Sequence, residues 1–114
     1  MADNTSELLQ GTLELLVLKT LSLEPMHGWG IAQRIQQISR ETFSVNQGSL
    51  YPALQRMLRK GWIKSSWQTS DNNRRARYYN LTAAGRKQLE HERADWERAS
   101  NAVNWILAWS GGAP

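Results

Sequence analysis

The sequence contains no cysteine and only two histidines among its 114 residues. The absence of cysteine excludes a disulfide framework, a thiolate metal site and a cysteine nucleophile. His27 and His91 fall on different predicted elements and lack metal-ligand spacing, and no residues group as nucleophile, acid and base. We therefore predict a protein that is not an enzyme and that uses neither a metal nor a cofactor.

Long hydrophobic runs are also missing. No apolar stretch approaches the roughly 18 residues of a membrane span. The first seven residues are polar and acidic, unlike a secretory signal. A length of 114 residues and a hydrophobic fraction of 40% fit one small domain with an appended helix. The sequence thus predicts a soluble, cytoplasmic protein with no membrane partner.

Positive charge gathers in one stretch of the chain. The net charge is +4, and residues 41–80 alone carry seven basic and two acidic side chains. Residues 1–40 have a net charge of −1, and residues 81–114 are balanced. This distribution favours a polyanionic partner. A solvated basic face that binds nothing is the alternative at this point.

Helical periodicity dominates the first half of the chain. Residues 8–21 form an apolar pattern that covers much of a helix circumference, so this helix is expected to be buried on more than one side. A second helix opens at His27-Gly28, and its apolar face carries Ile31, Ile35 and Ile38.

A third helix starts at Asn46 or Ser49, which are both good N-caps. Pro52 is tolerated best within a first helical turn, which favours the later start. Gly61 ends this helix.

After the third helix the period changes from 3.6 to 2. Residues 62–68 alternate and place Ile63, Ser65 and Trp67 on one face, residues 69–73 form a turn, and residues 77–81 form a second strand. Thr82 then caps a long last helix that runs to Ser110-Gly111-Gly112.

The element order is three short helices, a hairpin and a long helix. This order predicts a mainly α fold with a small β-hairpin, a winged helix-turn-helix followed by one long C-terminal helix. We assign residues 1–81 to the winged domain, 82–110 to the long helix, for which the family resemblance and the heptad-like seam described below imply dimerisation, and 111–114 to a flexible tail.

The basic stretch coincides with the third helix and the wing, which favours double-stranded DNA as the partner. Arginines at the wing tip suit phosphates, and polar side chains at the front of the third helix suit base edges. Tyr51 suits a phosphate through its hydroxyl, with packing on the hairpin as its alternative. The candidate DNA-binding residues are Gln47, Ser49, Tyr51, Gln55, Lys64, Arg74, Arg75 and Arg77.

Four blocks of the sequence resemble the PadR family of bacterial transcriptional regulators. They are Leu9-Gln10-Gly11-Thr12-Leu13-Glu14-Leu15-Leu16-Val17-Leu18, Pro25-Met26-His27-Gly28-Trp29, Gly48-Ser49-Leu50-Tyr51-Pro52-Ala53-Leu54 and Arg77-Tyr78-Tyr79-Asn80-Leu81-Thr82-Ala83-Ala84-Gly85. The resemblance implies a homodimeric, nucleoid-associated repressor on an inverted-repeat operator, of the subgroup with a short C-terminal part. Trp29 stands where the family usually has tyrosine, and Asn72-Asn73 replaces a wing tip often richer in glycine.

A second copy of the chain is the other expected partner. A monomer of this size does not easily bury both sides of the first helix and the heptad-like seam of the last one. The candidate interface residues are Leu8, Leu15, Leu89, Trp96, Ala99, Val103 and Ile106.

Trp96, in the middle of that seam, has two readings. It is either an interface hot spot without a ligand, which is the commoner role, or the contact of a flat, apolar or aromatic effector, as the resemblance allows. Two alternatives to DNA binding also stay open, namely a winged-helix protein-interaction module and a dimer that binds small molecules.

Overall fold

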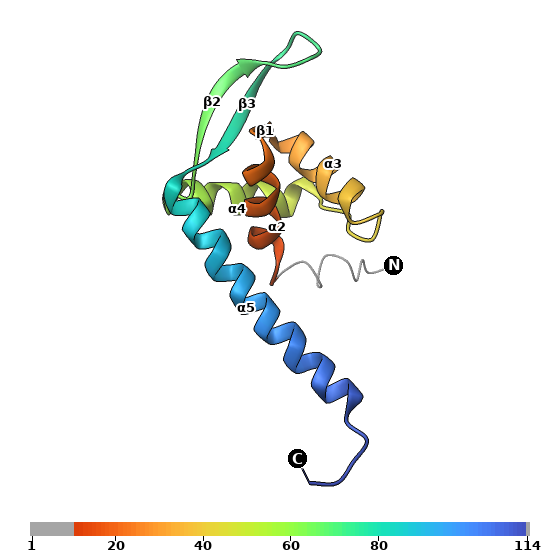
Figure 1. The fold of residues 1–114 in the computed structure, drawn as a ribbon. Coiled ribbons are helices and arrows are strands. Elements are labelled where there is room, and N and C mark those ends of the chain that lie inside the picture. The colour runs from red at the N-terminus through yellow and green to blue at the C-terminus, as the bar shows by residue number, and fades with distance from the viewer. Residues whose placement is uncertain (1–10, 114) are drawn as a thin grey trace.

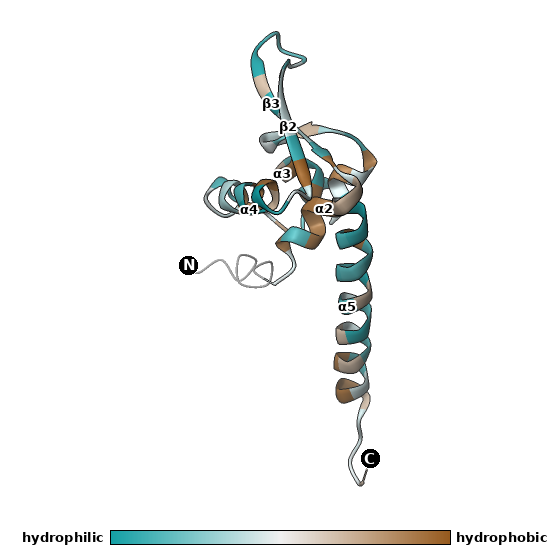
Figure 2. Ribbon diagram, turned by 90° about the vertical axis from the view of Figure 1, so that its left-hand side faces the viewer, coloured by the Kyte–Doolittle hydropathy of each residue, from teal (hydrophilic) through white to brown (hydrophobic). Residues whose placement is uncertain are grey.

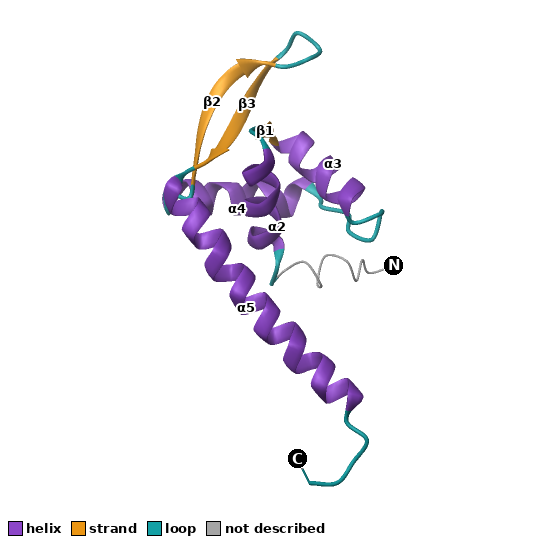
Figure 3. Cartoon of the chain, in the orientation of Figure 1, coloured by secondary structure: helices purple, strands orange, loops and turns teal. Residues whose placement is uncertain are grey.

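The computed structural model describes residues 11–113, in which a bundle of short helices carries a hairpin at one end and a long helix at the other (Figure 1). The element order follows the sequence prediction closely, and Figure 3 shows it by element type. The elements are α2 (Leu13–Leu23), β1 (Met26–His27), α3 (Gly28–Ile38), α4 (Gln47–Arg59), β2 (Ile63–Thr69), β3 (Arg75–Leu81) and α5 (Ala83–Ala108). The mainly helical winged fold is thus confirmed.

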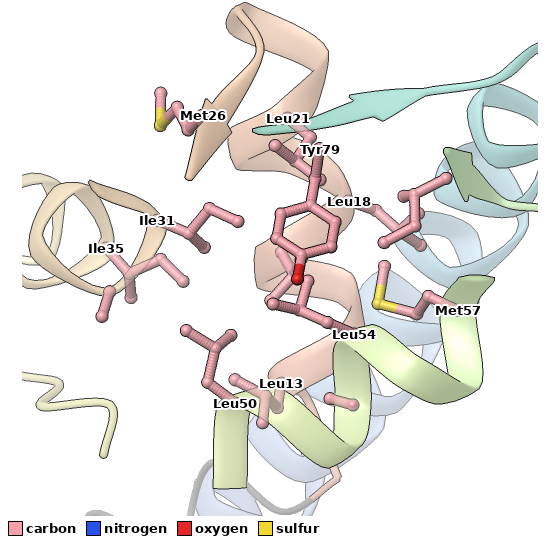
Figure 4. Packing of buried hydrophobic residues seen from close by; sticks show 14 of the residues in the cluster. Leu13, Leu18, Leu21, Met26, Ile31, Ile35, Leu50, Leu54, Met57 and Tyr79 are labelled. Atoms are coloured by element: carbon pink, nitrogen blue, oxygen red, sulfur yellow. The ribbon is translucent and has the colours of Figure 1, made fainter. Parts of the chain in front are cut away.

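The three short helices bury one apolar core (Figure 4). The first helix contributes from more than one side, as predicted, because Val17, Leu18 and Leu21 are buried and Leu15 and Leu16 pack against the core. Figure 4 shows the ring of Tyr79 entering this core from β3. Residues 8–10 of the predicted first helix lie outside the described residues.

The sheet has three antiparallel strands in the order β1-β3-β2. The predicted hairpin is present, with β2 and β3 paired from Ile63↔Leu81 to Thr69↔Arg75. The third strand was not predicted: β1 is a two-residue strand in which Met26 pairs with Tyr79 and His27 with Tyr78. A segment this short has no periodicity of its own, so only tertiary pairing reveals it.

The hairpin register gives the wing (residues 63–81) two different faces. Odd-numbered positions of β2 and β3 pair with each other, so their side chains share a face. We call this the inner face of the wing: Ile63, Ser65, Trp67, Thr69, Arg75, Arg77, Tyr79 and Leu81. Near the helices it is buried through Ile63 and Tyr79, and toward the tip it is exposed at Trp67. The predicted common face of Ile63, Ser65 and Trp67 is confirmed.

The start of α4 corrects the preference for Ser49. The helix begins at Gln47, and the Asn46 side chain caps it by accepting from the Ser49 N–H at 2.8 Å. Pro52 therefore lies inside the helix and cannot donate to the carbonyl of Gly48. Gly48 is exposed, so water can serve that carbonyl, and the cap at Asn46 offsets the lost bond.

Two glycines fix the connections around the wing. Gly61 ends α4 as predicted, with φ of 75°, and the N–H of Trp62 donates to the carbonyl of Met57. Gly85 lies in the first turn of α5, where a Cβ would overlap the carbonyl oxygen of Trp62. Only glycine lets α5 start this close to the foot of β2.

The long helix α5 starts in the core and leaves it. Thr82 caps it as predicted by accepting from the Gly85 N–H at 3.0 Å, and Leu89 is buried. Figure 2 shows that the helix then projects away from the other elements and becomes hydrophobic near its end. We call residues 96–109 the α5 end.

Candidate nucleic-acid interface

A groove of about 710 Å³ separates the inner face of the wing from α3 and α4. Its lining is polar and aromatic, with three arginines and one carboxylate, that of Asp71. The lining residues are His27, Gly28, Trp29, Tyr51, Gln55, Trp67, Ser70, Asp71, Asn72, Arg74, Arg75, Ala76, Arg77 and Tyr79. Five of the eight predicted DNA-binding residues line this groove, namely Tyr51, Gln55, Arg74, Arg75 and Arg77.

Tyr51 forms part of the helical wall. Its ring lies against Gly28 so closely that a Cβ at Gly28 would be 3.0 Å from the Tyr51 hydroxyl oxygen. The ring is still 45% exposed, so its outer part remains open to the groove. Gly28 thus lets α3 and α4 approach each other at the Tyr51 ring.

Gln47 and Ser49 lie at the exposed front of α4, in its first turn, outside the lining of the groove. The Ser49 N–H is used by the Asn46 cap, whereas no side-chain hydrogen bond of Gln47 or Ser49 exists within residues 11–113. Both side chains are therefore open to an external partner.

Two wing arginines are held against inner-face neighbours. The Arg75 guanidinium lies 5.4 Å from the centre of the Trp67 ring. The Arg77 Nε donates to the Ser65 hydroxyl at 2.9 Å, and its guanidinium lies 5.9 Å from the Tyr79 ring. Such contacts orient a guanidinium without neutralising it.

The wing tip is a tight turn that carries Arg74. The Ser70 N–H donates to the Arg74 carbonyl at 2.7 Å, and Asn73 has φ of 62°, the positive value expected at this tip. Among residues 11–113, Arg74, Arg75 and Arg77 form no ion pair with a carboxylate. Their charge is free for an anionic partner.

Lys64 is separated from these arginines. It pairs with Asn80 in the hairpin register, so its side chain is on the outer face of the wing. Arg56 of the basic stretch is also turned away, because its Nε lies 3.2 Å from the Glu14 carboxylate. The positive charge that faces the groove therefore comes from the wing.

Four aromatic residues of the groove were not among the predicted site residues: His27, Trp29, Trp67 and Tyr79. His27 caps α3, its Nδ1 accepting from the Gly30 N–H at 3.0 Å, and its ring stacks on Trp29 with centres 6.3 Å apart. The strand alternation already placed Trp67 on the inner face, so this residue could have been predicted from the sequence. Trp29 needed the arrangement of α3 beside the wing.

Burial and charge act on Tyr79 at the base of the groove. Burial raises the pKa of its phenol, while the Arg77 guanidinium lowers it and the Tyr51 ring raises it. Burial is the largest of the three effects, so the phenol stays neutral well into the alkaline range.

The candidate interface residues divide into buried and exposed ones. Leu89 is in the core and Leu15 packs against it. Trp96, Ala99, Val103 and Ile106 are exposed on α5, whereas Leu8 lies outside the described residues. Beyond Arg98 the α5 end has no charged side chain, and Figure 2 shows this hydrophobic stretch.

No helix in the described part of the chain is long and apolar enough to cross a membrane. Within residues 11–113, no three acidic or histidine side chains are grouped to hold a metal ion.

A sequence profile of the PadR-like transcriptional regulator family matches residues 17–91 of the chain. A transcriptional regulator of Mycobacterium tuberculosis is 31% identical over 85% of this chain and 87% of its own length. The chain belongs to the PadR-like family, as its sequence blocks suggested. Its relatives in that family are transcriptional regulators, which supports a DNA-binding regulator.

Solved structures carry the same fold. A PadR-like transcriptional regulator from Bacillus cereus is 29% identical, with a TM-score of 0.78 over 91% of this chain and 99% of that one. A PadR family transcription regulator from Clostridium difficile is 32% identical, with a TM-score of 0.71 over 84% and 98% of the two chains.

Proposed function

We propose that this protein is a sequence-specific repressor that binds an inverted-repeat operator as a homodimer. The observation that carries the proposal is the groove, in which three unpaired wing arginines face the exposed side of α4. A regulator of this kind has no enzymatic activity and works in the cytoplasm, on the nucleoid.

Each part of the interface has its own role in the proposal. The front of α4 enters the major groove, where Gln47, Ser49 and Gln55 reach base edges. Tyr51 and the wing arginines bind phosphates and fix the register of the protein on the duplex. Lys64, on the outer face, adds a weaker and more distant attraction.

The α5 end supplies the surface that binds the second copy of the chain. Trp96 and Val103 are seven residues apart on one helix face, and they are 50% and 54% exposed. Ala99 and Ile106 continue that face, so two copies of α5 bury it against each other. In this proposal residues 1–81 bind DNA and residues 82–110 lie between the copies. A two-fold dimer presents two α4 helices to two half-sites about 34 Å apart.

Release by a flat apolar effector completes the proposal. The two copies of Trp96 would face each other near the two-fold axis, where a planar molecule can stack between indoles. A direct Trp96 contact between the copies, without a ligand, is the competing outcome.

The test is fluorescence anisotropy of the purified protein with its own upstream DNA and with a random duplex, at several salt concentrations. A preference of at least about 10³ for the upstream DNA is expected. Arg75→Ala and Arg77→Ala should each lower the slope of log affinity against log salt by about 0.9, and Lys64→Ala by less. Weak, equal binding to both duplexes would mean that the operator lies outside the upstream DNA. No binding to either at low salt would favour a protein-interaction module instead.

The effector is tested on the same complex. A library of planar apolar compounds is screened for release of the upstream DNA, with Trp96→Ala as the variant that should no longer respond. A compound that releases DNA from both proteins equally would place its site elsewhere, and a dimer that forms normally without any response would leave Trp96 as an interface residue only.

A further inference from the structure

Two tryptophan side chains in the groove are largely exposed, although phosphate binding by this groove does not require exposed indoles. Trp29 on α3 and Trp67 on β2 are each 61% exposed, and both line the groove. Large aromatic side chains grouped on a concave surface are typical of an interaction site. Arginines alone would suffice for phosphate, so the indoles point to an occupant with apolar faces as well.

The surroundings of the two indoles narrow the chemistry of that occupant. Trp67 lies beside the Arg75 guanidinium, and Arg77 is its direct cross-strand partner on the same inner face. A wholly apolar occupant would strip water from the unpaired arginines at a high cost. A free phosphate would leave both indoles in water. A sugar–phosphate strand offers alternating anions and apolar ring faces, and it matches both kinds of wall.

We propose that the groove holds the sugar–phosphate backbone of one DNA strand, and that Trp29 and Trp67 contact its deoxyribose rings. This inference rests on the proposed DNA binding and adds a non-ionic part to it. The strand runs between α4 and the wing, with Arg75 and Arg77 on its phosphates. Trp29 touches the strand from the helical wall and Trp67 from the wing.

The two tryptophans differ in a way that makes the proposal testable. Trp67 contacts Arg75, so its removal also frees that guanidinium. The ring contact of Trp29 within residues 11–113 is with His27, and no arginine lies over it. A loss of affinity at Trp29 therefore reports the indole itself.

The experiment compares Trp29→Ala, Trp67→Ala and Arg75→Ala in the full-length protein, on the operator and on a random duplex, over a range of salt concentrations. Each tryptophan variant should weaken binding by about threefold to tenfold on both duplexes, because every sequence has the same sugars. The salt slope should stay unchanged in Trp29→Ala, since no phosphate contact is lost, and fall by about 0.9 in Arg75→Ala. Trp67→Phe should retain most of the affinity.

Several results would overturn the inference. Unchanged affinity in both tryptophan variants, with Arg75→Ala still weakened, removes the indoles from the interface while DNA binding stands. Weakening on the operator alone would make them base contacts. Trp67→Ala and Arg75→Ala could show the same salt slope, with no further loss of affinity when the two substitutions are combined. Trp67 would then only position the Arg75 guanidinium. Failure of the unaltered protein to bind any duplex would instead sink the proposed function. Thermal melting confirms that each variant folds.

Discussion

Tryptophans are exposed in two regions of the molecule, and the residues around them differ in kind. In the groove, Trp29 and Trp67 share their surface with three arginines, amides and hydroxyls. At the α5 end, Trp105 and Trp109 are 73% and 50% exposed, and the stretch beyond Arg98 in which they lie has no charged side chain. The indoles are the same, but their neighbours suit a polyanion in one place and an apolar protein surface in the other.

The largest expected effect separates the two regions. Val103→Asp places a charge on the α5 face that we assign to the second copy, so it should convert dimer to monomer in analytical ultracentrifugation. Operator affinity should fall by at least about 100-fold, because two half-sites are no longer bound together. Asn104→Asp adds the same charge one residue further along, off that face, and should leave the dimer intact. A dimeric Val103→Asp protein would refute the assignment, and Arg75→Ala should stay dimeric.

A somewhat smaller effect is expected at the joint between the regions. Gly85→Ala would force a Cβ against the carbonyl of Trp62 and the side chain of Leu81, so the foot of the wing and α5 must move apart. We expect a loss of about 2–3 kcal/mol in the free energy of unfolding, measured by urea denaturation. Gly11→Ala is the matched control, because a Cβ there meets nothing within 4 Å. Equal stability of the two variants would contradict the tight joint.

A third prediction concerns the front of α4, beside the groove. Asn46→Ala removes the side-chain acceptor at the start of α4 and should lower stability by about 1 kcal/mol in the same assay. Because Gln47 and Ser49 follow this cap, operator preference over random DNA should fall as well, with the dimer unaffected. Asn46→Asp keeps an acceptor and should restore both properties. A loss of stability with an unchanged preference for the operator would show that the cap does not contribute to base recognition.

The smallest effect is a pH dependence at the base of the groove. Burial raises the pKa of Tyr79, so the folded protein holds this proton longer than the unfolded chain does. The stabilising contribution is complete below pH 10 and is lost as the pH rises through the folded-state pKa. Tyr79→Phe should therefore lose less stability between neutral and strongly alkaline pH. Parallel stability curves for the two proteins, measured by denaturant melts across that range, would rule out this role.

Much of the fold was predictable because its signals are local. The opening of α3 at His27-Gly28, the cap at Thr82 and the stop at Gly61 lie where short-range rules place them. The strand β1 was not predictable, since two residues carry no period and form a strand only by pairing with β3. The start of α4 was misjudged because the rule against proline inside a helix was weighed above the cap at Asn46.

The candidate site was predicted less completely, because it also depends on contacts between elements that are far apart in the sequence. The wing arginines, Tyr51 and Gln55 come from the charge and helix patterns, and all of them line the groove. The strand alternation already placed Lys64 on the face opposite Ser65 and Trp67, but only the hairpin register puts Arg75 and Arg77 on the face of Trp67. Trp29 belongs to the groove only because α3 packs beside the wing, which no local pattern encodes.

The Thr82 hydroxyl lies within 2.6 Å of the Gly61 carbonyl oxygen and 2.9 Å of that of Trp62, while it also caps α5. This ties the end of α4, the foot of the wing and the root of α5 to one point. A helix of 26 residues spans about 39 Å. Pivoting such a lever by about 5° at that point displaces its tip by about 3 Å. If the ends of two such helices are held together, the same small rotation moves the two winged domains and changes the spacing between them.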